Sequence, residues 1–237
     1  MLKRTLLAAA LFSVSAIAIA SGGHGEKPQA NPWTHFSLDN QIRAMPSGDA
    51  TRGQDIHSQM MCNACHGEKG ESPSRNYASL NGQPEAYTIK MMLDYRDGRR
   101  WENYHQAEIM VKISQALNDQ QIADLASFYA QHKTQPWTYA QPLAAAEQAP
   151  TDKVVRKGDF ERMLTPCASC HGAKGEGNGV VPALAGQVPE YFVRTMKAYQ
   201  SGERHNDVQK GMSQFTHDLS DEEIQALAEY YAAMDRQ

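Results

Sequence analysis

The chain has 237 residues, of which 41% are hydrophobic and 21% charged, and its formal net charge is −4. Because the basic residues are scattered among acidic ones, nucleic acid is not an expected partner. Beyond the N-terminus, no segment is long and apolar enough to be a transmembrane helix.

The N-terminus has the composition of a secretory signal peptide. Lys3 and Arg4 precede an uncharged run that ends in a small-residue cleavage site. The alternative is a retained membrane anchor, but the run is about 16 residues long and a spanning helix needs ~20. We therefore predict a signal peptide over residues 1–20, cleaved near Ala20, and export to a bacterial periplasm. Loss of Lys3 and Arg4 would change the formal charge from −4 to −6.

Residues 21–48 are polar and rich in glycine, proline and asparagine. They show no sustained hydrophobic periodicity, so we expect an extended polar leader. A segment of this kind is available for docking to a partner.

Two pentapeptides contain every cysteine of the chain. Cys62-Asn63-Ala64-Cys65-His66 recurs as Cys167-Ala168-Ser169-Cys170-His171. The pattern C-x-x-C-H is typical of covalent haem c attachment, in which two thiols on one turn reach the two vinyl groups and the histidine lies under the iron. A single copy also fits a chance match or half of a zinc site, but two copies with no further cysteine favour haem.

This motif predicts two covalently bound haem c groups. Cys62 and Cys65 would hold the first and Cys167 and Cys170 the second, with His66 and His171 as axial iron ligands. A disulfide between neighbouring cysteines would be transient at most, because thioether formation needs reduced thiols.

The sequence around the two motifs is duplicated. The motifs lie 105 residues apart, and other matches follow at offsets of 105, 104 and 102, which small insertions in the first copy explain. We predict one domain over residues 49–133 and a second over 152–237, joined by a proline-containing linker over 134–151. The matched pairs are Gly53 and Gly158, Leu80 and Leu184, Gln83 and Gln187, Tyr87 and Tyr191, Tyr95 and Tyr199, Gly98 and Gly202, and Arg100 and Arg204.

Each copy is predicted to be helical, giving an all-α fold of two small bundles around their haems. One helix precedes each cysteine pair, and another begins near Gln83 or Gln187 and ends near the following matched glycine. The last helix of each copy has a capping residue, Asn118 or Ser220. After these caps apolar residues follow at helical spacing, namely Ile122, Leu125, Ala126 and Tyr129 in the first copy and Ile224, Leu227, Ala228 and Tyr231 in the second.

The sixth iron ligand is chosen by register between the copies. Met110 and Met212 each lie seven residues before a matched leucine, in segments that we expect to be loops. A methionine thioether favours reduced iron and raises the potential relative to a second histidine. Met92 and Met196 also match, but they are expected in mid-helix, where side chains fill the core.

Four histidines are rival ligands and none of them has a counterpart in register. We expect polar-contact or surface roles for His57, His105, His205 and His217.

The combined pattern resembles the diheme cytochrome c4 family, which has two class I cytochrome c domains. The resemblance rests on two CHGxxGxG-type motifs, two L-x-G-Q-x(3)-Y segments, two G-x-R elements and a methionine before L-[SN]-D-x-x-I. It implies a soluble or membrane-associated periplasmic carrier that passes electrons towards terminal oxidases, with haems close enough for internal transfer. It also implies a proline whose carbonyl holds the axial histidine. Pro182 fits, whereas Ala78 stands at the matching position of the first copy, so the first haem is expected to differ.

We predict an electron carrier with redox protein partners and no catalytic residues. One alternative is a diheme subunit of a periplasmic dehydrogenase, such as a flavoprotein or quinoprotein complex. The other is a haem enzyme with an open iron position in the first domain, where the insertion of Trp101, Tyr104 and His105 lies.

Overall fold

The computed structural model describes residues 30–102, 105–141 and 145–234. The predicted signal peptide and the first part of the leader lie outside these residues. Over the described residues the regular structure is helical, apart from isolated bridges between Asp159 and Leu164 and between Asn178 and Val181. The all-α prediction is confirmed. None of the helices found there is both long and apolar enough to cross a membrane.

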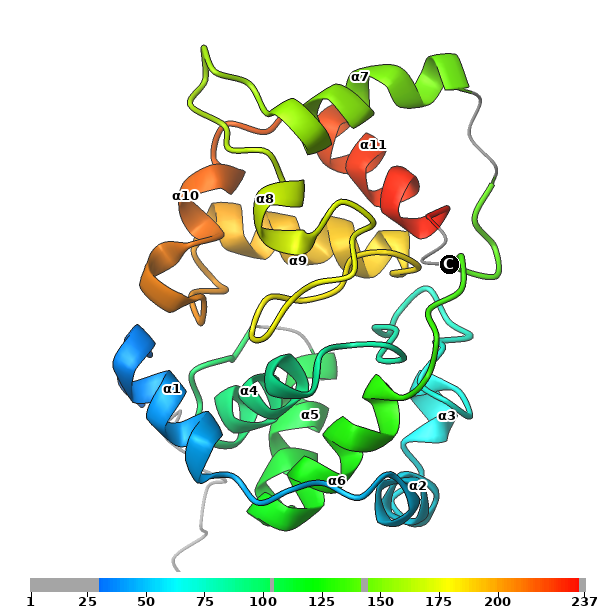
Figure 1. The fold of residues 1–237 in the computed structure, drawn as a ribbon, viewed down its shortest axis with the longest axis vertical. Coiled ribbons are helices and arrows are strands. Elements are labelled where there is room, and N and C mark those ends of the chain that lie inside the picture. The colour runs from blue at the N-terminus through cyan, green and yellow to red at the C-terminus, as the bar shows by residue number, and fades with distance from the viewer. Residues whose placement is uncertain (1–29, 103–104, 142–144, 235–237) are drawn as a thin grey trace, which may run out of the picture.

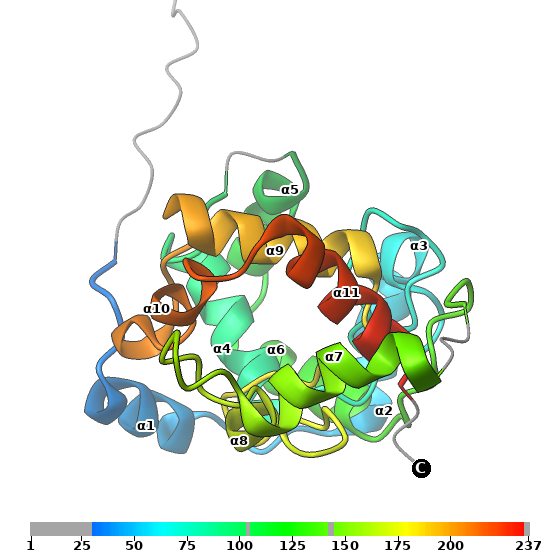
Figure 2. The ribbon, with the colours of Figure 1, turned by 90° about the horizontal axis from the view of Figure 1, so that it is seen from above.

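The helices form two halves that face each other (Figures 1 and 2). In Figure 1 the first half is the lower part and the second half the upper part. The first half contains α1 (His35–Ala44), α2 (Ala50–Gln59), α3 (Asn63–His66), α4 (Glu85–Arg96), α5 (His105–Gln115) and α6 (Asp119–Ala130). The second contains α7 (Ala145–Lys157), α8 (Ala168–His171), α9 (Pro189–Ser201), η1 (Val208–Lys210), α10 (Ser213–Thr216) and α11 (Asp221–Ala232).

The terminal helices α6 and α11 form as the sequence predicts. Asn118 and Ser220 are the N-caps, and each completes a capping box with the residue three positions later, Gln121 and Glu223. Both helices bury their predicted apolar face in the core of their own half. Burial of this face, rather than intrinsic propensity, is the main source of stability for helices of this length.

The leader contains a helix, α1, which corrects the prediction of an extended segment over residues 35–44. Thr34 caps α1 and forms a capping box with Ser37. Trp33 and Leu38 are buried in the core of the first half, and Ile42 packs against the same cluster. Three widely spaced apolar residues in a polar segment give little periodic signal, so the helix is held by tertiary packing. Figure 1 shows α1 along the side of the first half, below α10.

The predicted linker also contains packed structure. Trp137 is buried against Val188 and Ala232 of the second half. Its backbone nitrogen donates to the Ala232 carbonyl at 2.8 Å, and its indole nitrogen donates to the Ser72 carbonyl of the first half at 3.3 Å. In addition, α7 begins at Ala145, inside the predicted linker. The segment therefore joins the halves by contacts as well as by chain connection.

Gly53 and Gly158 precede their motifs at equal spacing but serve different purposes. Gly53 lies in α2, where an added Cβ would come within 2.1 Å of the Asp124 carbonyl oxygen on α6. It allows the two helices to cross at close range. Gly158 follows the end of α7 with a φ of +70° and opens a hairpin that reaches Leu164. The matched spacing is therefore not a structural equivalence.

Candidate haem attachment sites

Both C-x-x-C-H motifs fold into a single helical turn, α3 and α8. In each turn the backbone nitrogen of the histidine donates to the backbone carbonyl of the first cysteine at 2.9 Å. The bonds run from His66 to Cys62 and from His171 to Cys167. A glycine with positive φ ends each turn and directs the chain away. The four thiols are free. Each motif thus has its two cysteines and its histidine on one helical turn.

The proximal histidines make the same contact in both halves. His66 Nδ1 lies 2.8 Å from the carbonyl oxygen of Ala78, and His171 Nδ1 lies 2.9 Å from that of Pro182. A carbonyl only accepts, so Nδ1 must carry the proton and the lone pair of Nε2 is left for a metal. Burial lowers the pKa of both imidazoles, which favours this neutral form.

The missing proline of the first copy therefore does not remove the histidine contact. The acceptor is a backbone carbonyl, which alanine supplies as well as proline does. Proline adds a fixed φ at that position, not a hydrogen-bonding group.

The two methionines chosen by register lie in different local structures. Met212 is the N-cap of α10 and packs against the second core, where Cys167 also lies. Met110 lies inside α5, not in a loop, and packs against two apolar clusters of the first half. The loop prediction is wrong for Met110, because a separate helix that the sequence analysis did not predict, α5, runs through this residue. The proposal of Met110 as an iron ligand therefore rests only on its register with Met212.

The rival methionines lie in the cores as expected. Met92 in α4 and Met196 in α9 are both buried among apolar side chains.

The histidines outside the motifs have other surroundings. His57 is buried, with Nδ1 2.9 Å from the Tyr129 hydroxyl and Nε2 3.0 Å from the Gly67 carbonyl, so both of its nitrogens are occupied. His205 contacts the backbone of Glu203, and His217 is exposed. Nothing is described of the His105 side chain.

A buried charged cluster lies where the two halves meet. Arg100 and Arg204, which match in register, are 5% and 3% exposed. Arg100 Nε donates to Glu102 at 2.9 Å and its Nη2 donates to the Tyr191 hydroxyl at 3.2 Å, while Arg204 lies 4.0 Å from Glu102. Burial alone would raise the pKa of the Tyr191 phenol, but the two guanidinium groups outweigh it and lower that pKa to about 8.

This cluster suits an anionic group. Within it two guanidinium groups share the Glu102 carboxylate, and the lowered pKa of Tyr191 reflects the excess positive field. Buried cations need anionic partners, and haem propionates are such partners. The repeated G-x-R element marked both arginines in the sequence. It did not mark Glu102, which lies beside the insertion and has no counterpart.

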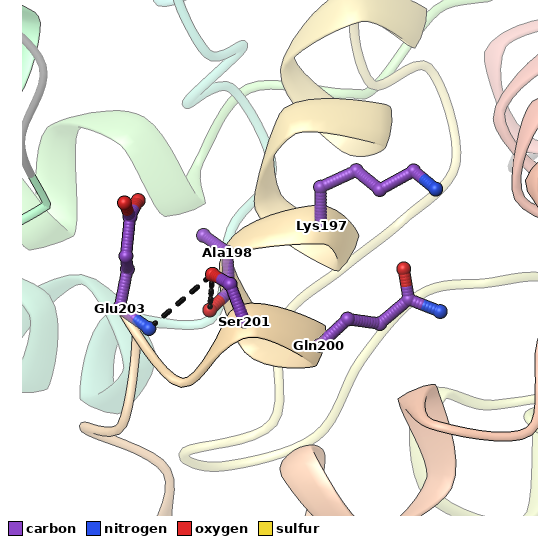
Figure 3. Close-up of a pocket in the computed structure, with 5 residues that line it drawn as sticks. All are labelled: Lys197, Ala198, Gln200, Ser201 and Glu203. Carbon is purple, nitrogen blue, oxygen red and sulfur yellow. Dashed lines mark hydrogen bonds between the residues drawn. The ribbon is translucent and has the colours of Figure 1, made fainter.

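The described chemistry therefore fits haem c. Each half offers two thiols on one turn and an imidazole with Nε2 available, and a buried cluster with two arginines lies where the halves meet. By contrast, the pocket in Figure 3 lies on the surface at the end of α9 and is lined by Lys197, Ala198, Gln200, Ser201 and Glu203. Ser201 there bonds to the Ala198 carbonyl, which is local helix-end structure and forms no part of the haem sites.

Comparison with known proteins agrees with this chemistry. The family model described as cytochrome c matches residues 50–133, and the one described as cytochrome c oxidase, cbb3-type, subunit III matches residues 160–230. The cytochrome c4 of Pseudomonas aeruginosa is 32% identical over 79% of this chain and 89% of its own length. The thiosulfate dehydrogenase electron acceptor of Stutzerimonas stutzeri is 31% identical over 77% and 86%.

A solved structure extends the likeness to the fold. The crystal structure of reduced recombinant cytochrome c4 from Pseudomonas stutzeri matches with a TM-score of 0.69 and 30% identity, over 79% of this chain and all of that one. Two cytochrome c domains of this kind carry two covalently bound haem c groups and serve electron transfer. The chain belongs to the cytochrome c4 family.

Proposed function

We propose that the protein is a periplasmic electron carrier whose irons are held by His66 and Met110 in the first half and by His171 and Met212 in the second. The observation that carries this proposal is the imidazole contact, which recurs at 2.8 and 2.9 Å. It leaves the same nitrogen of each histidine available to iron.

The covalent links would be formed by the four cysteines. Each thiol adds across one vinyl group, so that sulfur bonds to one carbon and the thiol hydrogen goes to the other. Cys62 and Cys65 would form one pair of thioethers, and Cys167 and Cys170 the other. None of the four is paired in a disulfide.

The bound haems would supply two one-electron couples, and the chain would set their potentials through ligands, burial and charge. With both axial positions filled, neither iron would offer a place to substrate. We therefore propose that the protein is not itself an enzyme.

Export would precede haem attachment. The proposed signal peptide over residues 1–20 would direct the chain to the periplasm and be removed near Ala20. An N-terminal mass measurement on protein from the periplasm tests this directly, since a retained anchor would leave the chain at full length in the membrane fraction.

Two kinds of redox partner fit an electron carrier of this family. We propose passage of electrons towards a terminal oxidase and peripheral association with the membrane. The relatives named as thiosulfate dehydrogenase electron acceptors favour a second candidate, in which the chain takes electrons from a periplasmic dehydrogenase or is one of its subunits.

Purification and rapid mixing separate these roles. A free carrier is expected to purify alone, to be reduced by its donor and to be reoxidised by oxidase-containing membranes. Co-purification with a catalytic chain would support the subunit alternative. Binding of carbon monoxide to one haem of the reduced protein would support an open iron position, for which the first half is the candidate because Met110 lies within a helix.

A further inference from the structure

Two matched glutamines bind across the boundary between the halves. Gln187 Oε1 accepts from the Ser79 nitrogen at 2.8 Å, and its Nε2 donates to the Ser79 carbonyl at 3.1 Å. In the opposite direction, Gln83 Oε1 accepts from the Ala183 nitrogen at 2.9 Å, and its Nε2 donates to the Ala183 carbonyl at 2.9 Å. Both side chains are buried: Gln83 is 5% exposed and Gln187 is 6% exposed.

Each glutamine contacts a peptide group that also holds a proximal histidine. The Ser79 nitrogen belongs to the same peptide unit as the Ala78 carbonyl, which lies 2.8 Å from His66 Nδ1. The Ala183 nitrogen likewise shares its peptide unit with the Pro182 carbonyl, which lies 2.9 Å from His171 Nδ1. Each imidazole is thus one peptide group away from a side chain of the other half.

This arrangement couples the two hydrogen bonds of each peptide. When its N–H donates to a glutamine oxygen, a peptide unit is polarised and its carbonyl becomes a stronger acceptor. A stronger acceptor at Nδ1 makes the imidazole more basic at Nε2, and groups of this kind tune the metal that the histidine binds. A more basic imidazole stabilises oxidised iron and lowers the potential.

We propose that Gln187 tunes the iron bound by His66 and that Gln83 tunes the iron bound by His171, so that each half sets the potential of the other. The proposal rests on the proposed function, because it requires His66 and His171 to be iron ligands.

Other contacts between the halves do not involve these peptides and supply a control. Arg75 Nη1 donates to Glu190 at 2.8 Å across the boundary. Arg75→Gln therefore weakens the interface without touching either histidine path.

The test is a redox titration followed by proton NMR, with the haem methyl signals assigned to each half. In Gln187→Leu the first haem is expected to shift to a higher potential while the second stays in place, and in Gln83→Leu the pattern is reversed. Arg75→Gln is expected to leave both potentials unchanged. Faster exchange of the Ser79 amide in Gln187→Leu, and of the Ala183 amide in Gln83→Leu, would report the loss of the bond independently of the haems.

Equal shifts of both haems in each variant, a shift within the glutamine's own half or no shift at all would overturn the proposal. If Gln187→Leu fails to fold, Gln187→Asn keeps an amide that is too short to reach, and the same crossed pattern is expected. The proposed function is judged separately, on the wild-type protein. If its spectra show two haems ligated by histidine while the variants show no crossed shift, only this inference fails.

Discussion

The Nδ1 atom of His66 lies 2.8 Å from the carbonyl oxygen of Ala78, where the second half has Pro182 in the matching position. The contact depends on the path of the backbone and not on the side chain. The proline therefore stiffens the loop without being required to orient the ring.

Pro182→Ala is expected to keep the His171 contact and to cost about 0.4–1 kcal/mol of stability, because the unfolded chain gains freedom. Thermal unfolding measures the loss, and the absorption spectrum of the second haem checks the ligation. If the spectrum of this variant showed that His171 no longer binds the iron, the backbone carbonyl alone would not be enough to orient the imidazole.

Gly53→Ala is expected to destabilise the first half by about 3 kcal/mol, because the new Cβ would meet the backbone of α6 and overpack the crossing. Denaturant unfolding measures the change. Gly211→Ala is the matched control, since the nearest atom there lies at 3.2 Å, and we expect it to cost less than about 1 kcal/mol. Equal losses in the two variants would mean that the helix crossing is not the cause.

Asp124 of α6 forms hydrogen bonds with residues at the N-terminus of α2. Its carboxylate accepts from the Asp49 nitrogen at 2.8 Å and from Arg52 at 2.8 and 2.9 Å. The hydrogen bond with Arg52 lowers the pKa of Asp124 in the folded state. The stabilisation is therefore complete above the unfolded pKa of about 3.9 and is lost as the pH falls through the lower folded value.

Asp124→Asn is expected to cost about 2 kcal/mol at neutral pH, because charge-assisted hydrogen bonds are lost. Its stability is also expected to fall less than that of the wild type as the pH drops below about 4. Unfolding at a series of pH values tests both. The exposed pair of Asp39 and Arg43 provides the control, and Asp39→Asn should change little. Parallel curves for wild type and Asp124→Asn would refute the role of this carboxylate.

Trp33→Ala is expected to cost about 3 kcal/mol and to release α1 from the first half. The indole packs in the core, donates to Asp94 and lies under the Arg99 guanidinium, 3.7 Å from the ring centre. Limited proteolysis should then cut near residues 35–44 in the variant before it cuts the wild type. Resistance equal to that of the wild type would show that α1 is held without this residue.

Much of the fold followed from local patterns. The capping boxes at Asn118 and Ser220 and the spacing of apolar residues after them predicted α6 and α11 because neighbours in sequence determine both features. The internal duplication predicted the two halves and paired His66 with His171. It also paired Gln83 with Gln187, although the residues that they bond across the boundary lie 100 and 108 positions away in the sequence.

The failures share a cause, which is tertiary packing. The helix α1 forms where Trp33 and Leu38 find a core, and the sequence of the leader alone shows no such core. Met110 was expected in a loop because it precedes a capped helix, yet α5 continues through it. Gly158 matches Gly53 by spacing only, since it opens the hairpin closed by the bridge between Asp159 and Leu164, whereas Gly53 lies inside a helix.

The central claim is that both irons are closed by a histidine and a methionine, and one measurement tests it most directly. Oxidised protein with two such haems shows a weak methionine–iron charge-transfer absorption in the far red, and Met110→Ala and Met212→Ala are each expected to remove about half of it. Met92→Ala, which changes a matched core methionine, is the control and should leave it intact. An unchanged absorption in Met110→Ala would contradict the account, because the first iron would then have another ligand.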